Sequence, residues 1–103
     1  MRTTISIIVS EHYGNIRTIS DREGNVLYCL KDIRKIFDLS REDSRLWLRE
    51  GGVADKYLLP NRAAGKYVAR FADLNNVEDF LASAGLFASS KDFVNWLKQE
   101  ACN

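Results

Sequence analysis

A continuous strand-to-helix segment, Gly24 to Ser40, most constrains how this chain can fold. Its first half is a five-residue apolar run, Val26 to Leu30, which is typical of a buried β-strand. Its second half carries Ile33, Ile36 and Phe37, which have the i, i+3, i+4 spacing of one helix face. Because no loop separates the halves, the strand fixes the direction of the helix against the sheet. The rest of the chain must pack around this junction.

Four further strands are predicted around this segment. Thr4–Val9 is compact and β-branched, and Ile16–Ile19, with the order Ile-Arg-Thr-Ile, is the second predicted strand. The polar loop Asp21–Asn25 contains Gly and Asn, so it is the usual connection of a hairpin between the second strand and the junction strand. A second hairpin is predicted from Tyr57–Leu59 and Lys66–Phe71, with Asn61 to Gly65 as its loop and Pro60 at the end of its first strand.

The first two predicted helices follow the junction strand directly. The first covers about Asp32–Leu39. Ser40, followed three residues later by Asp43, resembles a capping box and predicts a second helix over Arg41–Arg49. That helix should stop at Gly51-Gly52, because glycine readily adopts the positive φ of a helix C-terminus.

Two more helices are predicted to close the chain. Asn75 or Asn76 can cap the third, which ends at Gly85, and Ser89 or Ser90 can cap the fourth. The resulting order is β-β-β-α-α-β-β-α-α. The sequence therefore predicts the α+β class, with two β-hairpins or a short antiparallel sheet packed with about four short helices.

Length and composition indicate one soluble domain over residues 1–103. A chain of 103 residues can bury one core and not two. Two cysteines, Cys29 and Cys102, make no disulfide framework, and with His12 as the one histidine they supply no zinc site. No segment has the pattern of a signal peptide or a membrane span. We expect a cytoplasmic protein with no cofactor, no metal and no membrane partner.

Residues suited to catalysis are few. His12 lies in a predicted turn, where a solvated turn residue is the favoured interpretation. A nucleophilic cysteine needs an electropositive, partly exposed setting, whereas Cys29 lies in the most apolar strand and is expected to be a small buried hydrophobe. No glycine-rich phosphate loop occurs. We therefore expect that the protein is not an enzyme.

Basic residues gather on three predicted elements, although the formal net charge is only +1. Arg41, Arg45 and Arg49 recur every fourth residue, so they share one face of the second helix. The other candidates lie on the first helix and the second hairpin: Lys31, Arg34, Lys35, Arg62, Lys66 and Arg70. In a nucleic-acid-binding protein such cations contact backbone phosphates. The alternative is a solubilising face whose charge is diluted by interleaved acidic residues.

Trp47 is a candidate for contact with a protein partner. It has no obvious apolar partner on its helical face and lies beside Arg45 and Arg49. Trp and Arg are favoured anchors of protein interfaces. This residue therefore supports a protein-binding alternative to nucleic-acid binding.

The segment VLYCLKDIRKIFDLS, Val26 to Ser40, resembles the signature of the Bro-N family, the N-terminal domain of baculovirus Bro proteins and of phage and prophage antirepressors. Lys31-Asp32-Ile33 stands at the family's Lys-Asp-Val position, and Ile36-Phe37 stands at its apolar pair. Ser90 to Leu97 is similar to the family's C-terminal Ser-Lys-x-x-x-Phe-x-x-Trp helix, with a shorter gap before Phe. The likeness spans roughly Tyr13 to Glu100.

The resemblance implies a DNA-binding transcriptional regulator of phage or prophage antirepressor type, acting in the cytoplasm of a host bacterial cell. Its expected partners are double-stranded DNA, a repressor-type protein, or both, and a homo-oligomer is compatible with it. The chain departs from the family where an acidic residue is replaced by Leu74 or Asn75. Members of the family usually carry a second domain after this one, whereas the sequence ends at Asn103. The alternative is a protein-binding inhibitor that captures a repressor or another DNA-binding protein without itself binding DNA.

Overall fold

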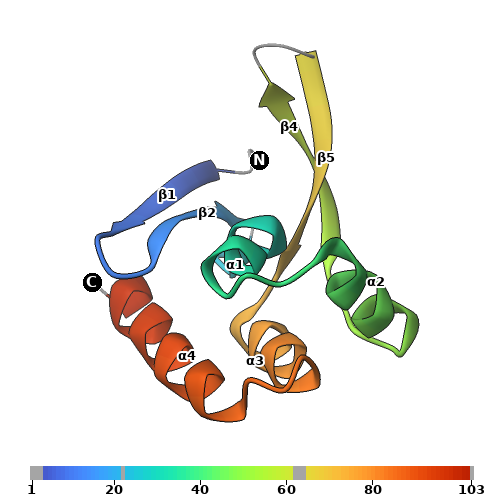
Figure 1. The fold of residues 1–103 in the computed structure, drawn as a ribbon. Coiled ribbons are helices and arrows are strands. Elements are labelled where there is room, and N and C mark those ends of the chain that lie inside the picture. The colour runs from blue at the N-terminus through green and yellow to red at the C-terminus, as the bar shows by residue number, and fades with distance from the viewer. Residues whose placement is uncertain (1–3, 22, 62–64, 103) are drawn as a thin grey trace.

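The computed structural model describes residues 4–21, 23–61 and 65–102. Within these ranges it contains a five-stranded antiparallel sheet and four helices, which confirms the predicted α+β class (Figure 1). The strands are β1 (Thr4–Ser10), β2 (Gly14–Ser20), β3 (Val26–Cys29), β4 (Asp55–Asn61) and β5 (Gly65–Ala72). The helices are α1 (Leu30–Ile36), α2 (Arg41–Arg49), α3 (Leu74–Ser83) and α4 (Phe87–Cys102). None of the described helices is long and apolar enough to span a bilayer.

The two predicted hairpins join in one sheet of order β1-β2-β3-β5-β4, so β1 and β4 are its edge strands. β3 meets β5 only at the pairs Tyr28–Ala72 and Cys29–Phe71. β4 and β5 remain paired from Asp55–Phe71 to Asn61–Gly65. These two strands therefore extend beyond the sheet as a two-stranded ribbon, called the ribbon below (Figure 1).

The strand-to-helix junction forms as predicted, with Cys29 as the last residue of β3 and the N-cap of α1. The predicted range of the helix, Asp32–Leu39, is displaced towards the C-terminus, because α1 begins at Leu30 and ends at Ile36. The helix ends early because Asp38 adopts a positive φ of 54°. Asp tolerates this left-handed conformation better than most residues. The turn directs the chain from α1 into α2.

The second helix spans Arg41–Arg49, as predicted from its capping signal. The Ser40 side chain accepts a hydrogen bond from the Asp43 backbone N–H, and the Asp43 carboxylate accepts one from the Ser40 N–H at 2.8 Å. This reciprocal pair satisfies two backbone donors at the start of α2. The capping box therefore fixes where α2 begins relative to α1.

The predicted starts of the two C-terminal helices are wrong. The Asp73 carboxylate, rather than Asn75 or Asn76, caps α3 by accepting from the Asn76 N–H at 2.8 Å. α4 begins at Phe87, so Ser90 lies inside the helix and donates its hydroxyl to the Phe87 carbonyl. In α3 a third polar residue, Asp73, precedes the two candidates and acts as the cap, whereas α4 begins before both of its candidate serines.

The first strand of the ribbon also continues past its predicted end. β4 runs to Asn61 and places Pro60 opposite Lys66. A proline lacks the N–H that a central strand needs, but an edge strand tolerates it. Because β4 is an edge strand, Pro60 does not interrupt it.

The main core lies between the helices and one face of the sheet. Its buried residues come from all four helices and from β2, β3 and β5: Ile16, Tyr28, Leu30, Ile33, Trp47, Ala72, Val77, Phe80, Leu81, Phe93, Val94 and Leu97. By strand alternation a second core lies on the opposite face and contains Ile19, Leu27, Cys29, Leu59, Ala69 and Phe71. Ile5 of β1 and Leu59 of β4 line one hollow, so the sheet curls and brings its two edge strands near each other.

Trp47 is a core residue, so the expectation that it docks a partner at an exposed edge is wrong. Only 3% of it is exposed, and its indole N–H donates to the Asp79 carboxylate at 2.7 Å. Its ring lies 5.3 Å from that of Phe80, measured between centroids. Trp47 therefore attaches α2 to α3 and presents no ring surface to a partner.

Replacing Gly52 with Ala should destabilise the fold through this tryptophan. A Cβ at Gly52 would overlap the Trp47 ring, and the ring is held by its hydrogen bond to Asp79. We expect the free energy of unfolding to fall by about 1–3 kcal/mol, the usual effect of overpacking a core. Urea denaturation measures this loss. Val53→Ala is the control, since Val53 is exposed and should change stability by less than about 0.5 kcal/mol; equal losses in the two variants would contradict the prediction.

Candidate functional site

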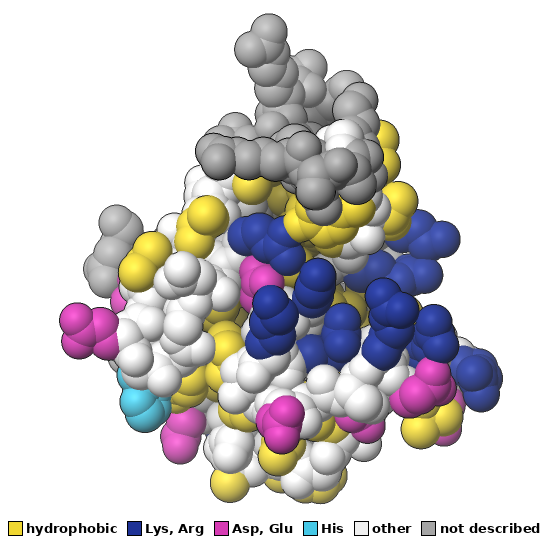
Figure 2. Space-filling model, turned by 45° about the horizontal axis from the view of Figure 1, so that its top comes forward, with side chains coloured by type: hydrophobic (Ala, Val, Ile, Leu, Met, Phe, Trp, Pro, Cys, Tyr) yellow, Lys and Arg dark blue, Asp and Glu magenta, His cyan; other side chains and the backbone are white. Residues whose placement is uncertain are grey.

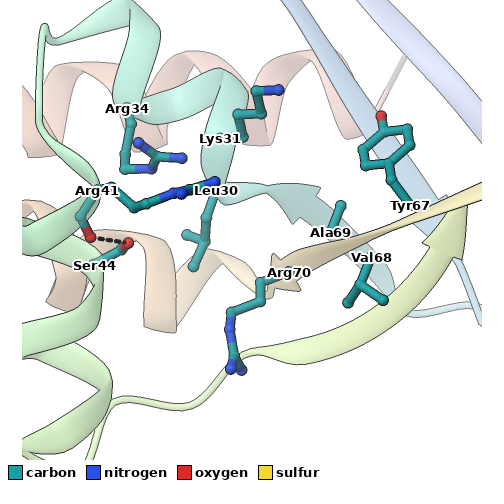
Figure 3. A pocket seen from close by; sticks show the side chains of 9 residues that line it. All are labelled: Leu30, Lys31, Arg34, Arg41, Ser44, Tyr67, Val68, Ala69 and Arg70. Carbon is teal, nitrogen blue, oxygen red and sulfur yellow. Dashed lines mark hydrogen bonds between the residues drawn. The ribbon is translucent and has the colours of Figure 1, made fainter. Parts of the chain in front are cut away.

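The most basic hollow among the described residues lies between α1, α2 and β5 (Figure 3). Its volume is about 320 Å³. The lining residues are Leu30, Lys31, Arg34, Arg41, Ser44, Tyr67, Val68, Ala69 and Arg70. Two consecutive helices and a strand more distant in the sequence thus each supply at least one cation, and none of the residues that line this hollow is acidic. It is called the basic hollow below.

One side of the basic hollow is formed by β5, whose edge is accessible there because β3 is short. β3 pairs with β5 only at Phe71 and Ala72, so no described strand pairs with that edge of β5 between Tyr67 and Arg70. These four consecutive residues line the basic hollow. α1 contacts β5 but does not pair with it as a strand would. The strand edge and the two helices therefore leave a gap where β3 ends.

The cations of the basic hollow form no ion pair with any side chain that the structure describes. Among the side chains that the structure describes, the ion pairs are Arg17–Asp32 and Arg45–Glu42, and neither involves Lys31, Arg34, Arg41 or Arg70. Figure 3 shows Arg34 of α1 and Arg41 of α2 extending towards each other. Holding like charges close together without a carboxylate is unfavourable, and the resulting positive field attracts anions. The arrangement is suited to an anionic ligand.

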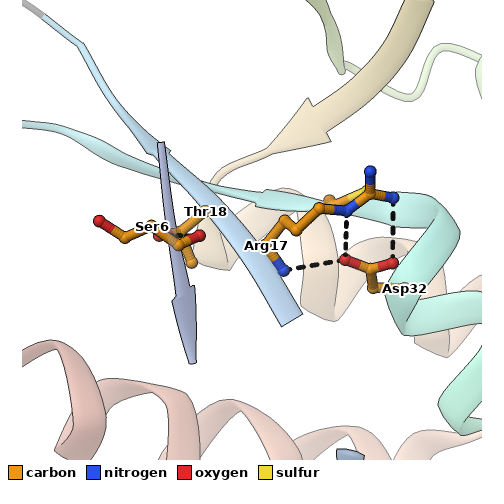
Figure 4. A network of polar contacts seen from close by, with 5 residues as sticks. Ser6, Arg17, Thr18 and Asp32 are labelled. Carbon is orange, nitrogen blue, oxygen red and sulfur yellow. Dashed lines mark hydrogen bonds and ion pairs between the residues drawn. The ribbon is translucent and has the colours of Figure 1, made fainter. Parts of the chain in front are cut away.

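An ion pair between β2 and α1 holds the helix that carries two of these cations (Figure 4). The Asp32 carboxylate accepts from Arg17 Nε at 3.0 Å, from Nη2 at 3.1 Å and from the Arg17 backbone N–H at 2.8 Å. The hydrogen bond to Asp32 raises the pKa of the Arg17 guanidinium above its ordinary value, although desolvation opposes this shift. Both oxygens of Asp32 are thus used to fix α1, and Arg17 keeps its charge.

Tyr67 joins this ion pair to the basic hollow. The Arg17 guanidinium carbon lies 5.6 Å from the centre of the Tyr67 ring, and Lys31 Nζ lies 6.0 Å from it. Cations at this distance are attracted by the electrons of an aromatic face. Tyr67 is only partly buried, so its ring forms a wall of the basic hollow and contributes to the positions of both cations.

Cys29 is buried, as its apolar setting predicts. Burial raises the pKa of its thiol above the ordinary value of 9.0, with a smaller opposing effect from Arg17. The Arg17 Nη2 lies 3.4 Å from the sulfur. A protonated, inaccessible thiol is a poor nucleophile at neutral pH. The contact with Arg17 therefore supports packing rather than reactivity.

The raised pKa of Cys29 predicts a loss of stability in alkaline solution. Above about pH 9 the unfolded chain releases the thiol proton while the folded chain retains it, so the free energy of unfolding should fall as pH rises. Urea denaturation between pH 7 and about 10 measures this slope. Cys29→Ala should flatten it, whereas an unchanged slope in that variant would contradict the prediction.

The structure brings together four of the predicted basic residues and separates the others from them. Lys31, Arg34, Arg41 and Arg70 line the basic hollow. Arg45 is held by Glu42 at 2.8 Å on the exposed part of α2, and Arg49 and Lys35 are exposed outside the basic hollow. Arg62 lies outside the described residues, and so does the side chain of Lys66. Figure 2 shows Lys and Arg side chains gathered across the middle of one face of the molecule.

Three residues of the site escaped prediction from sequence. Ser44 and Tyr67 line the basic hollow, and Arg17 fixes α1 through Asp32. Arg17 lies between Ile16 and Thr18 in β2, and this local pattern gives no signal that it contacts a helix. Nothing in the local pattern connects it with Asp32, fifteen residues later.

Comparisons with known protein families, curated proteins and solved structures find no match for this chain.

Proposed function

We propose that this protein is a DNA-binding regulatory domain of the phage or prophage antirepressor type, and that the basic hollow binds the backbone of duplex DNA. The observation that carries the proposal is the set of four cations with no acidic residue among the lining residues. Phosphate groups supply the negative charge that is missing among the lining residues. The regulatory and phage assignment is supported by the resemblance of Val26–Ser40 to the Bro-N signature.

The charge distribution favours a local contact over general attraction. With 15 basic and 14 acidic residues the whole chain has almost no net charge. Attraction of a polyanion must therefore come from a surface where cations are concentrated. The basic hollow is such a surface, because α1, α2 and β5 each contribute cations to its lining.

Fluorescence anisotropy of a labelled mixed-sequence duplex, titrated with the full chain, tests this function. We expect binding at low salt, and an affinity that falls with salt with a logarithmic slope of about −3.6 if each of the four cations neutralises one phosphate. No change in anisotropy at about 50 mM salt and protein concentrations up to about 10⁻⁴ M would refute the proposal.

A second candidate function is capture of a repressor-type protein through β1. This edge strand carries no charged residue from Thr4 to Ser10, and Ile5, Ile7 and Val9 are 46%, 58% and 74% exposed. An uncharged apolar edge strand can pair with a strand of another protein. Co-purification with a purified repressor from the same genome tests it: Ile7→Lys should abolish retention and Arg34→Ala should not. Retention that survives Ile7→Lys would exclude β1 as the contact.

A further inference from the structure

The ribbon presents two unequal faces. Its register places Lys56 opposite Arg70 and Leu58 opposite Val68. Because side chains alternate along a strand, these two pairs lie on one face, called the outer ribbon face. The opposite face carries Leu59, Ala69 and their neighbours, which are buried in the second core.

Two features of the outer ribbon face are unfavourable for the isolated protein. Lys56 and Arg70 are like charges directly opposite each other, which destabilises a strand pair, and neither takes part in an ion pair among the described side chains. Leu58 and Val68 form an apolar pair that is 59% and 60% exposed. Both features become favourable if a ligand supplies negative charge beside the cations and apolar groups beside Leu58 and Val68.

We infer that the outer ribbon face inserts into the major groove of DNA, where Leu58 and Val68 contact thymine methyl groups and Lys56 and Arg70 contact flanking phosphates. This inference rests on the function proposed above. A two-stranded ribbon fits the major groove, which is about 12 Å wide, and the thymine methyl is the apolar group exposed there. Val68 and Arg70 belong both to this face and to the lining of the basic hollow, so the two surfaces are continuous.

Charge complementarity favours DNA over a protein as the occupant of this face. Leu58 and Val68 lie beside the Lys56–Arg70 pair on the same face. The basic hollow adjoins this face, because Val68 and Arg70 also line it. Figure 2 shows exposed hydrophobic side chains next to the group of Lys and Arg side chains. A polyanion with apolar groups in its groove matches both features. A protein partner would need an acidic rim around an apolar centre.

The test is selection of preferred duplexes from a random pool by the full-length protein, followed by affinity measurements on the selected duplex. Each duplex is compared with a scrambled one and with a copy in which deoxyuridine, which lacks the methyl group, replaces thymine.

The wild type should lose about fourfold in affinity for each contacted methyl group removed, the factor for burying one carbon. Leu58→Ser/Val68→Ser should bind the selected, scrambled and deoxyuridine duplexes equally. If circular dichroism shows that the double variant does not fold, the single variants Leu58→Ser and Val68→Ser are measured in its place.

The control is Val53→Ser, because Val53 is an exposed valine outside the ribbon and this variant should retain the preference of the wild type. The inference is overturned if the ribbon variant keeps the preference, if Val53→Ser loses it equally, or if wild type ignores the methyl groups. It is also overturned if light scattering shows that the ribbon variant instead loses self-association. If wild type binds no duplex at all, the proposed function fails first, so the two failures are distinguishable.

Discussion

Replacing Arg34 and Arg41 together by Ala is expected to weaken binding to duplex DNA roughly 100-fold, because each charge-assisted hydrogen bond to a phosphate contributes about 1.5 kcal/mol. Both side chains line the basic hollow and extend towards each other from α1 and α2 (Figure 3). The logarithmic salt slope should become shallower by about 1.8, since two phosphate contacts are lost. Fluorescence anisotropy over a range of salt concentrations measures both quantities.

Two control pairs separate a local effect from a change in net charge. Lys91→Ala/Lys98→Ala removes two exposed cations from α4, which contributes nothing to the basic hollow, and should leave affinity nearly unchanged. Arg45→Ala/Arg49→Ala removes two from α2 itself, and its effect should be much smaller because Arg45 is already paired with Glu42. Equal losses in all three double variants would mean that DNA responds to total charge and not to the basic hollow.

Asp32→Ala is expected to lower the free energy of unfolding by about 3 kcal/mol, because it leaves a partly buried guanidinium without its partner. The side chains of Arg17 and Asp32 are only 24% and 12% exposed. The substitution also removes the acceptor of the Arg17 backbone N–H. For a chain of this size the midpoint of thermal unfolding should fall by roughly 15 °C, measured by circular dichroism. Asp32→Asn should lose less, because its amide keeps one acceptor oxygen.

The same variant tests how the fold supports the site. Asp32→Ala raises the formal net charge by one unit, so attraction by charge alone would strengthen DNA binding. We expect weaker binding, because α1 is no longer tied to β2 and its cations Lys31 and Arg34 are less firmly positioned. Glu100→Ala gives the same change in charge at an exposed position and should change stability by less than about 0.5 kcal/mol. Tighter DNA binding by Asp32→Ala would contradict this account.

Local signals in the sequence were sufficient to predict most of the secondary structure. The capping residues Ser40 and Asp43 predict the range of α2, because capping is an interaction between near neighbours. The apolar run before Leu30 predicts the strand of the junction for the same reason. The caps of α3 and α4 were mispredicted because several polar neighbours could serve equally, and packing selected Asp73 and a start at Phe87.

The site was only partly predictable, because it is assembled by contacts distant in sequence. The four-residue spacing of Arg41, Arg45 and Arg49 indicates one helix face, but only Arg41 reaches the basic hollow. The short pairing of β3 with β5 creates the gap in which the hollow lies, and strand propensity does not predict that register. Trp47 was misassigned because its partner, Asp79, lies 32 residues away on α3.

An NMR titration of ¹⁵N-labelled protein with duplex DNA tests most directly whether the basic hollow is the surface that contacts DNA. We expect the largest shift changes at the Nε–H groups of Arg34 and Arg41 and at the backbone amides from Tyr67 to Arg70, with the amides of α4 unmoved. Changes confined to β1 or α4, or no changes at low salt with duplex in excess, would contradict this account.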